Sequence, residues 1–304
     1  MDVYRTPDER FVDLPEYPFE PHYLEWQGLR MHYLDEGDRP AEPILLLHGE
    51  PDWSYLYRKM LPTLVRRFRV VAPDYVGFGR SDKPTDIGWY SFDRHVESVK
   101  NLVRQLDLKR VTVVVQDWGG PIGLRTAVEM KDRFARLVVL NTGLFDADGW
   151  PTEGFLRWRA FAERVGVDME VGRVMQASMK SVLDDATRQA YEAPWPVRES
   201  KAGVAAFPLL VPLHAEDANA PALRKVAHEL RGWNVPALVC WSDGDPVFTL
   251  DHGQAMADNL PGAHGRLSVI PEAGHMLQED KGEDIAKRIV QWVSQPGQPG
   301  RPAG

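Results

Sequence analysis

The amino-acid sequence predicts an α/β fold in which helices flank a mostly parallel sheet and a helical segment is inserted between two strands. Short runs rich in Val, Ile and Leu alternate with longer segments of helical apolar spacing, as crossover helices between parallel strands require. These runs lack polar alternation, which indicates strands buried on both faces. This alternation of strand and helix patterns is interrupted over residues 146–213 and then resumes, which indicates that the insertion lies there.

The elements follow in order from the N-terminus. Two alternating segments, at residues 23–26 and 29–34, flank Gln27-Gly28 and predict an antiparallel hairpin. Buried strands are expected at 44–47, 69–72, 111–115, 137–140, 236–241 and 266–270. Helix-period apolar positions predict helices at 55–66, 91–106, 119–130, 251–259 and 279–293.

Residues 146–213 have a composition of their own. They combine aromatic-rich helical patterns with proline-punctuated turns such as Ala193-Pro194-Trp195-Pro196, and nothing in them has the pattern of a strand. We expect a helical cap at 146–213 over a core made of 1–145 and 214–304. The last residues, 295–304, are almost all Pro, Gly, Gln and Ala, a composition that predicts a disordered tail.

Length and composition limit the classes of protein to consider. A chain of 304 residues suggests one large domain or a core with an insertion. A net charge of −8 without a basic run argues against binding nucleic acid, because phosphate contact needs clustered Lys and Arg. The single cysteine, Cys240, cannot form an intrachain disulfide. The N-terminus lacks the apolar core of a signal peptide, and no stretch approaches the ~20 apolar residues that span a bilayer. We expect a cytoplasmic protein with no membrane partner.

The strongest catalytic signal is the segment 115–120, Val-Gln-Asp-Trp-Gly-Gly. A buried strand ends, Asp117 follows, and glycines open a helix, which is the pattern of a nucleophile elbow. Compared with the usual Gly-x-Ser-x-Gly motif, this segment has Asp117 in place of the serine and Val115 in place of the first glycine. An ionised carboxylate can attack carbon without a base to remove a proton. The alternative interpretation is that Asp117 only caps the helix.

Two later segments supply a candidate acid and base. Trp241-Ser242-Asp243-Gly244-Asp245-Pro246 follows one predicted strand, and His275 follows the next. The order nucleophile, acid, histidine is that of the α/β hydrolases. His275 is the candidate base and Asp245 its orienting acid. Asp243 competes as the acid, whereas His264 precedes its strand and is expected at the wrong edge of the sheet.

A third loop follows the strand at 44–47 and reads His48-Gly49-Glu50-Pro51. In this fold that loop and the residue after the nucleophile supply the backbone N–H groups of an oxyanion hole, here Glu50 and Trp118. No cluster of His, Cys and carboxylate residues has the spacing of a metal site, so neither a metal nor a cofactor is expected.

Three segments together resemble the haloalkane dehalogenases, most closely their subfamily I. They are 48–60 (HGEPDWSYLYRKM), 77–84 (GFGRSDKP) and 114–120 (VVQDWGG). The resemblance runs over roughly residues 20–293 and implies the α/β-hydrolase fold with an eight-stranded sheet and a cap. It implies Asp117 as nucleophile, His275 as base and Asp245 as acid.

The same resemblance implies a halide site made by two tryptophans. Trp118 matches one, and Trp158, in the segment Gly154-Phe155-Leu156-Arg157-Trp158, matches the other. An indole N–H is an uncharged donor, so two of them can hold a halide without adding a buried charge. Without the resemblance, Trp158 would be interpreted as a packing residue of the cap. The pocket residues implied are Phe155, Phe207, Pro208, Val211, Pro121 and Phe248.

The expected reaction is hydrolysis of a small apolar haloalkane through an alkyl ester of Asp117, by a monomer without cofactor. An epoxide hydrolase of this fold needs a pair of cap tyrosines, and Tyr191 is the only tyrosine in 146–213. A haloacid dehalogenase of this fold needs arginines beside the nucleophile, and Arg125 lies two turns further along the predicted helix. A non-catalytic receptor of the same fold is the alternative from another class.

Overall fold

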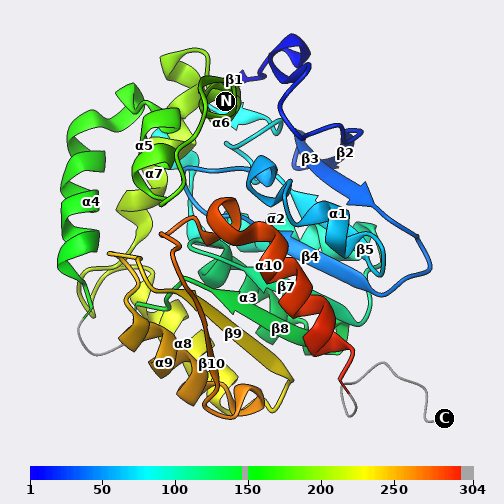
Figure 1. Cartoon of the computed structure of the whole chain (residues 1–304). Coiled ribbons are helices and arrows are strands. Elements are labelled where there is room, and N and C mark those ends of the chain that lie inside the picture. The colour runs from blue at the N-terminus through cyan, green and yellow to red at the C-terminus, as the bar shows by residue number, and fades with distance from the viewer. Residues whose placement is uncertain (146–149, 296–304) are drawn as a thin grey trace.

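A computed structural model describes residues 1–145 and 150–295 of the chain, and its centre is an eight-stranded sheet (Figure 1). The strand order is β10-β9-β8-β7-β4-β5-β3-β2. All neighbours from β10 to β5 are parallel, whereas β3 is antiparallel to both β5 and β2. The strands are β2 (His22–Trp26), β3 (Leu29–Glu36), β4 (Pro43–Leu47), β5 (Arg69–Pro73), β7 (Val111–Val115), β8 (Phe134–Leu140), β9 (Ala237–Ser242) and β10 (Leu267–Ile270). The predicted fold class is confirmed.

Helices cover both faces of this sheet. In Figure 1 α10 (Leu277–Val293) crosses in front of the sheet and packs against α1 (Leu61–Leu64). On the other face α3 (Gly119–Glu129) packs against both α2 (Phe92–Gln105) and α8 (Ala220–Arg231), and α9 (Leu250–Asn259) packs against β9. Ser91 caps α2 by accepting the N–H of Arg94, which satisfies a donor that the helix leaves unpaired.

Two local elements differ from the sequence predictions. The helix expected at 55–66 is broken into a 3-10 turn, Ser54–Tyr57, and the short α1. Pro62 explains the break, because a proline inside a continuous helix removes a hydrogen bond and clashes with the preceding turn. A second sheet, of β1 (Val3–Tyr4) and β6 (Lys83–Pro84), was not expected, and strands of two residues carry no periodic signal. Further 3-10 turns are Asp8–Phe11, Ile87–Trp89, Lys131–Arg133, Gly166–Asp168, Arg198–Lys201 and Pro261–Ala263.

The segment between β8 and α8 is helical in its described part. It contains α4 (Glu153–Val165), α5 (Val171–Ala177), α6 (Asp185–Glu192) and α7 (Ala202–Leu210), which form one group beside the sheet in Figure 1. Thr152 caps α4 and Asp184 caps α6 by accepting backbone N–H groups. Residues 150–213 are the described part of the cap expected at 146–213. The first four residues expected in it, 146–149, and residues 296–304 of the tail expected at 295–304 lie outside the described residues.

Within the part of the chain that the structure describes, no helix has both the length and the apolar character needed to cross a membrane.

Candidate active site

Asp117 lies on the sharp turn between β7 and α3. Its φ is +47°, in the left-handed region that side chains disfavour. The turn is held because Asp117 N donates to Asn141 O at 2.9 Å and Thr142 Oγ1 donates to Asp117 O at 2.6 Å. A Cβ at Gly119 would lie 2.0 Å from Leu47 O, so only glycine fits beside the turn. The Asp117 carboxylate is thereby fixed at the C-terminal end of β7.

His275 follows β10 and contacts two carboxylates. Its Nε2 lies 3.5 Å from Asp117 Oδ2, and its Nδ1 lies 2.8 Å from Asp245 Oδ2. Burial opposes the charged imidazole, but Asp245 and Asp117 outweigh it and raise the pKa of His275 well above its ordinary value. His264 lies before β10 and therefore at the opposite end of that strand.

The two aspartates after β9 have different partners. Asp245 Oδ2 faces His275 and also accepts from Asn141 Nδ2 at 2.8 Å, while its Oδ1 accepts two backbone N–H groups of the following loop at 2.7 and 3.0 Å. Asp243 instead accepts two backbone N–H groups from the loop before His275, at 3.2 and 3.4 Å. The structure thus brings Asp245 against the histidine and leaves Asp243 one loop away.

Glu50 joins the site through its backbone. Its N–H donates to Asp117 Oδ1 at 2.9 Å, on the carboxylate oxygen that does not face His275. The side chain is 5% exposed, and burial, with Asp117 and Asp52 adding to it, raises the pKa of Glu50 well above its ordinary range. Trp118 stands at the N-cap of α3, where backbone N–H groups have no partner inside the helix.

A cavity of about 680 Å³ opens above Asp117, between the core and the cap. Core and cap both contribute to its wall, and most of the lining side chains are apolar. The lining residues that the sequence singled out are Glu50, Asp117, Trp118, Phe155, Trp158, Pro208, Val211, Phe248 and His275. Trp118 is 4% exposed and Trp158 is partly buried, so both indoles border one largely apolar space.

Two expected pocket residues are not among the residues that line the cavity. Phe207 is 1% exposed and packs edge-on against Trp118, with ring centroids 5.2 Å apart. Pro121 is buried in the first turn of α3, a position that proline tolerates because no N–H is needed there. The cap instead adds Phe161, Val165, Met169 and Val174, together with the charged residues Arg157, Asp168, Glu170 and Arg173.

Comparison with known proteins identifies the family. The model of the alpha/beta hydrolase fold matches residues 42–282. A haloalkane dehalogenase of Psychrobacter cryohalolentis is 45% identical over 300 residues, covering 96% of this chain and 98% of the relative. Haloalkane dehalogenase 1 of Mycobacterium tuberculosis (strain ATCC 25618 / H37Rv) is 46% identical over 298 residues, covering 96% and 99%. The chain belongs to the haloalkane dehalogenase family.

A solved structure agrees with that family. The haloalkane dehalogenase DpaA from Paraglaciecola agarilytica NO2, whose structure is described as tetrameric, matches with a TM-score of 0.88 at 36% identity. The match covers 98% of this chain and 100% of that one. Fold and cap are therefore shared along nearly the whole length.

Two side chains that touch the haloalkane dehalogenase site were not found from the sequence. Gln116 Nε2 lies 3.3 Å from His275 Nε2 and donates to His275 O at 3.2 Å. Asn141, which follows β8, donates to Asp245 Oδ2 and to Ser242 Oγ. The only sequence signals are that Gln116 precedes Asp117 and that Asn141 ends a strand beside β7.

The residues that other reactions would need are engaged elsewhere. Tyr191 is buried, donates to Glu279 Oε2 and does not line the cavity. Arg125 pairs with Asp93 and Glu129 on the exposed side of α3. Among the described residues no group of three or more His, Cys, Asp and Glu side chains could hold a metal ion.

Proposed function

We propose that this chain hydrolyses haloalkanes in two steps through an ester between the alkyl group and Asp117. The observation that carries the proposal is a carboxylate, in place of a hydroxyl, on the left-handed turn below the cavity. An ionised carboxylate can attack carbon without first losing a proton, so the first step needs no base. Family membership makes the chain a hydrolase of carbon–halogen bonds, with a halogenated substrate and halide as a product.

In the first step Asp117 Oδ2 attacks the carbon behind the carbon–halogen bond, and the bonding electron pair leaves with the halide. The two oxygens are assigned from their partners, because Oδ1 accepts the Glu50 N–H whereas Oδ2 lies 3.5 Å from His275 Nε2. Oδ1 thereby becomes the carbonyl oxygen of the ester and already lies at a donor of the proposed oxyanion hole.

The halide leaves between the indole N–H groups of Trp118 and Trp158. Both side chains line the cavity that contains Asp117, one from α3 and one from α4. The indoles donate where negative charge develops as the halide leaves. The apolar wall excludes water, which strengthens each of these hydrogen bonds.

In the second step His275 removes a proton from water, which attacks the ester carbonyl carbon. Asp245 holds Nδ1–H, so Nε2 is the atom that accepts the proton. Ester formation neutralises Asp117, one of the two carboxylates that raise the pKa of His275, and so favours the neutral imidazole needed as a base. Collapse of the intermediate releases the alcohol, restores Asp117 and leaves one proton for solvent. No cofactor takes part.

We further propose the domain bounds, subfamily, compartment and oligomeric state that the sequence leads us to expect. Residues 1–145 and 214–304 form the catalytic core and 146–213 the cap, the chain is a member of subfamily I, and it works in the cytoplasm as a monomer. Every group named in the mechanism belongs to one chain, so no second copy is needed. Light scattering at micromolar concentration tests the last point, and a tetramer would contradict it.

Halide release from the halogenated compounds of a substrate panel, together with diol formation from styrene oxide, tests the activity. The protein should turn over 1-bromobutane and 1,2-dibromoethane many times, and should leave styrene oxide and fluoroacetate unchanged. Opening of styrene oxide would support the epoxide alternative, and fluoride release would support a haloacid dehalogenase. Binding without turnover of any of these compounds would support a receptor.

A further inference from the structure

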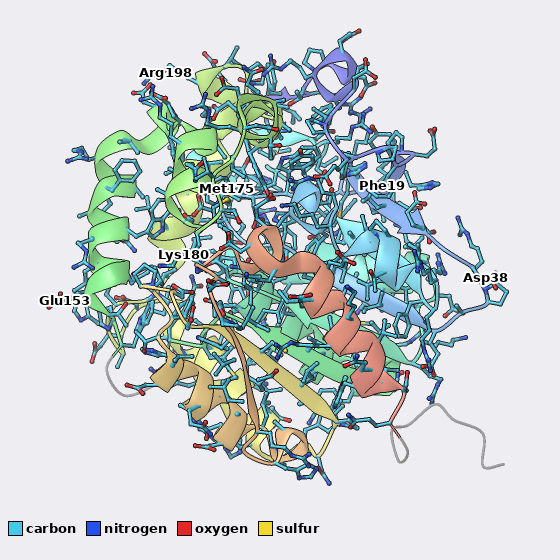
Figure 2. All side chains as sticks on the ribbon, in the orientation of Figure 1. Phe19, Asp38, Glu153, Met175, Lys180 and Arg198 are labelled. Carbon is cyan, nitrogen blue, oxygen red and sulfur yellow. The ribbon has the colours of Figure 1, made fainter. Side chains whose placement is uncertain are left out.

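The first turn of α10 carries a carboxylate that binds both the cap and the loop of His275. Asp280 Oδ1 accepts the N–H of Ser181 at 2.7 Å, and Oδ2 accepts the N–H of Gly274 at 2.8 Å. The N–H of Lys180 lies between the two oxygens, at 3.1 and 3.0 Å. Lys180 lies beside the beginning of α10 in Figure 2. One side chain thus joins two segments that are almost a hundred residues apart.

The same two segments also touch directly. Met276 N donates to Ser178 O at 3.1 Å, and a Cβ at Gly274 would lie 2.7 Å from that same carbonyl oxygen. Ser178 and Met276 both line the cavity. The cap turn 178–181 therefore packs directly against the loop that positions His275.

The turn that carries Asp280 is set apart from the rest of α10. Lys281 has a non-helical φ of −139°, so the helix is kinked immediately after Asp280. The neighbouring Glu279 binds Arg58 of the core at 2.8 Å and accepts from Tyr191 of α6. Residues 277–280 are thus held to the cap at two places, and only Met276 separates them from His275.

We propose that Asp280 is a positioning residue that couples the cap to His275, so that the histidine is aligned for ester hydrolysis only while the cap turn 178–181 is seated. This inference rests on the proposed two-step reaction. Alkylation uses Asp117, whose turn is held by Asn141 and Thr142 and not by Asp280. Loss of Asp280 leaves three backbone N–H groups without their acceptor, which loosens the histidine loop and slows only the second step.

A matched pair of substitutions tests this coupling. Asp280→Asn keeps the size of the side chain and removes one acceptor, while Asp280→Ala removes both. Asp284→Asn is the control, because Asp284 lies one turn further along α10 and is exposed. Single-turnover rapid quench with enzyme in excess over 1,2-dibromoethane separates the steps, since substrate loss reports alkylation and product alcohol reports ester hydrolysis.

We expect ester hydrolysis to slow about tenfold in Asp280→Asn and more in Asp280→Ala, with alkylation within about twofold of wild type. Asp284→Asn should match wild type in both rates. Equal slowing of both steps, or no slowing of either, would overturn the proposal. A general loss of stability would not selectively change the ratio of the two rates.

A second measurement needs no variant. In the wild-type protein, backbone hydrogen exchange of residues 178–181 and 274–276 should report one common opening, because the same carboxylate holds both segments. Independent opening of the cap turn would contradict the coupling. Failure of the two-step reaction itself would look different, because wild-type enzyme would then form alcohol with no ester preceding it.

Discussion

Replacing Asp245 by asparagine turns an acceptor into a donor at the point where the histidine is held. The N–H groups of Val247 and Phe248 donate to Asp245 Oδ1 at 2.7 and 3.0 Å, so the amide oxygen of an asparagine must take that position. Its NH2 group then faces His275 Nδ1, which lies 2.8 Å from Oδ2 in the wild type. Two donors cannot share this contact, so His275 adopts the tautomer that carries its proton on Nε2.

That tautomer cannot take a proton from water at Nε2, the atom that faces Asp117. Loss of the correct tautomer lowers the rate of a histidine-dependent step about 1,000- to 10,000-fold, or ~4–5.5 kcal/mol of barrier. Alkylation needs no base, so its rate should change little. The variant is therefore expected to release about one equivalent of bromide per site and then stop.

Asp243→Asn is the matched control, because the same substitution two residues away touches only backbone N–H groups of the histidine loop. Rapid quench with 1-bromobutane measures both steps in both variants. Asp243→Asn should keep steady-state turnover within about threefold of wild type, since weak exposed hydrogen bonds contribute little. A stalled Asp243→Asn beside an active Asp245→Asn would refute the assignment of the acid.

Four further substitutions test the site and its surroundings. Trp118→Phe and Trp158→Phe each remove one indole donor. Each substitution should lower kcat/KM for 1-chlorobutane about 10- to 100-fold. Each should also weaken bromide binding, which fluorescence quenching measures. Glu50→Gln should keep kcat at pH 7 within about threefold, because burial raises the pKa of Glu50 and so favours the neutral form that glutamine resembles. A large loss would show that the carboxylate is needed. Burial opposes ionisation of Glu279, but Arg58 outweighs it and lowers the pKa to about 2. This stabilisation is complete above the unfolded pKa of about 4.5 and is lost as the pH falls towards 2, so wild type should lose up to ~3 kcal/mol relative to Glu279→Gln in urea titrations over that range.

Some residues of the site could be predicted from the sequence because they lie in short sequence motifs. Asp117 follows a buried strand and precedes a glycine that nothing larger could replace, and His275 follows the last strand. Both positions depend on neighbours in the chain, and strand ends are visible as changes in pattern. The sheet and the hairpin were predictable for the same reason.

The features that could not be predicted depend on contacts between segments that lie far apart in the sequence. Asp243 and Asp245 follow the same strand, and only the position of the histidine ring distinguishes them. The family resemblance implied Phe207 as a pocket residue, but its burial against Trp118 depends on how α7 packs on the core. The four hydrogen bonds that Asp280 accepts join segments that no sequence pattern relates.

The covalent ester on Asp117 is the central claim, and one variant tests it directly. His275→Phe removes the proposed base and leaves the nucleophile and both indoles in place, so alkylation should proceed and hydrolysis should not. Incubated with 1-bromobutane, this variant should release about one equivalent of bromide and gain the mass of one butyl group on the peptide containing Asp117. Continued bromide release without any adduct would contradict the account.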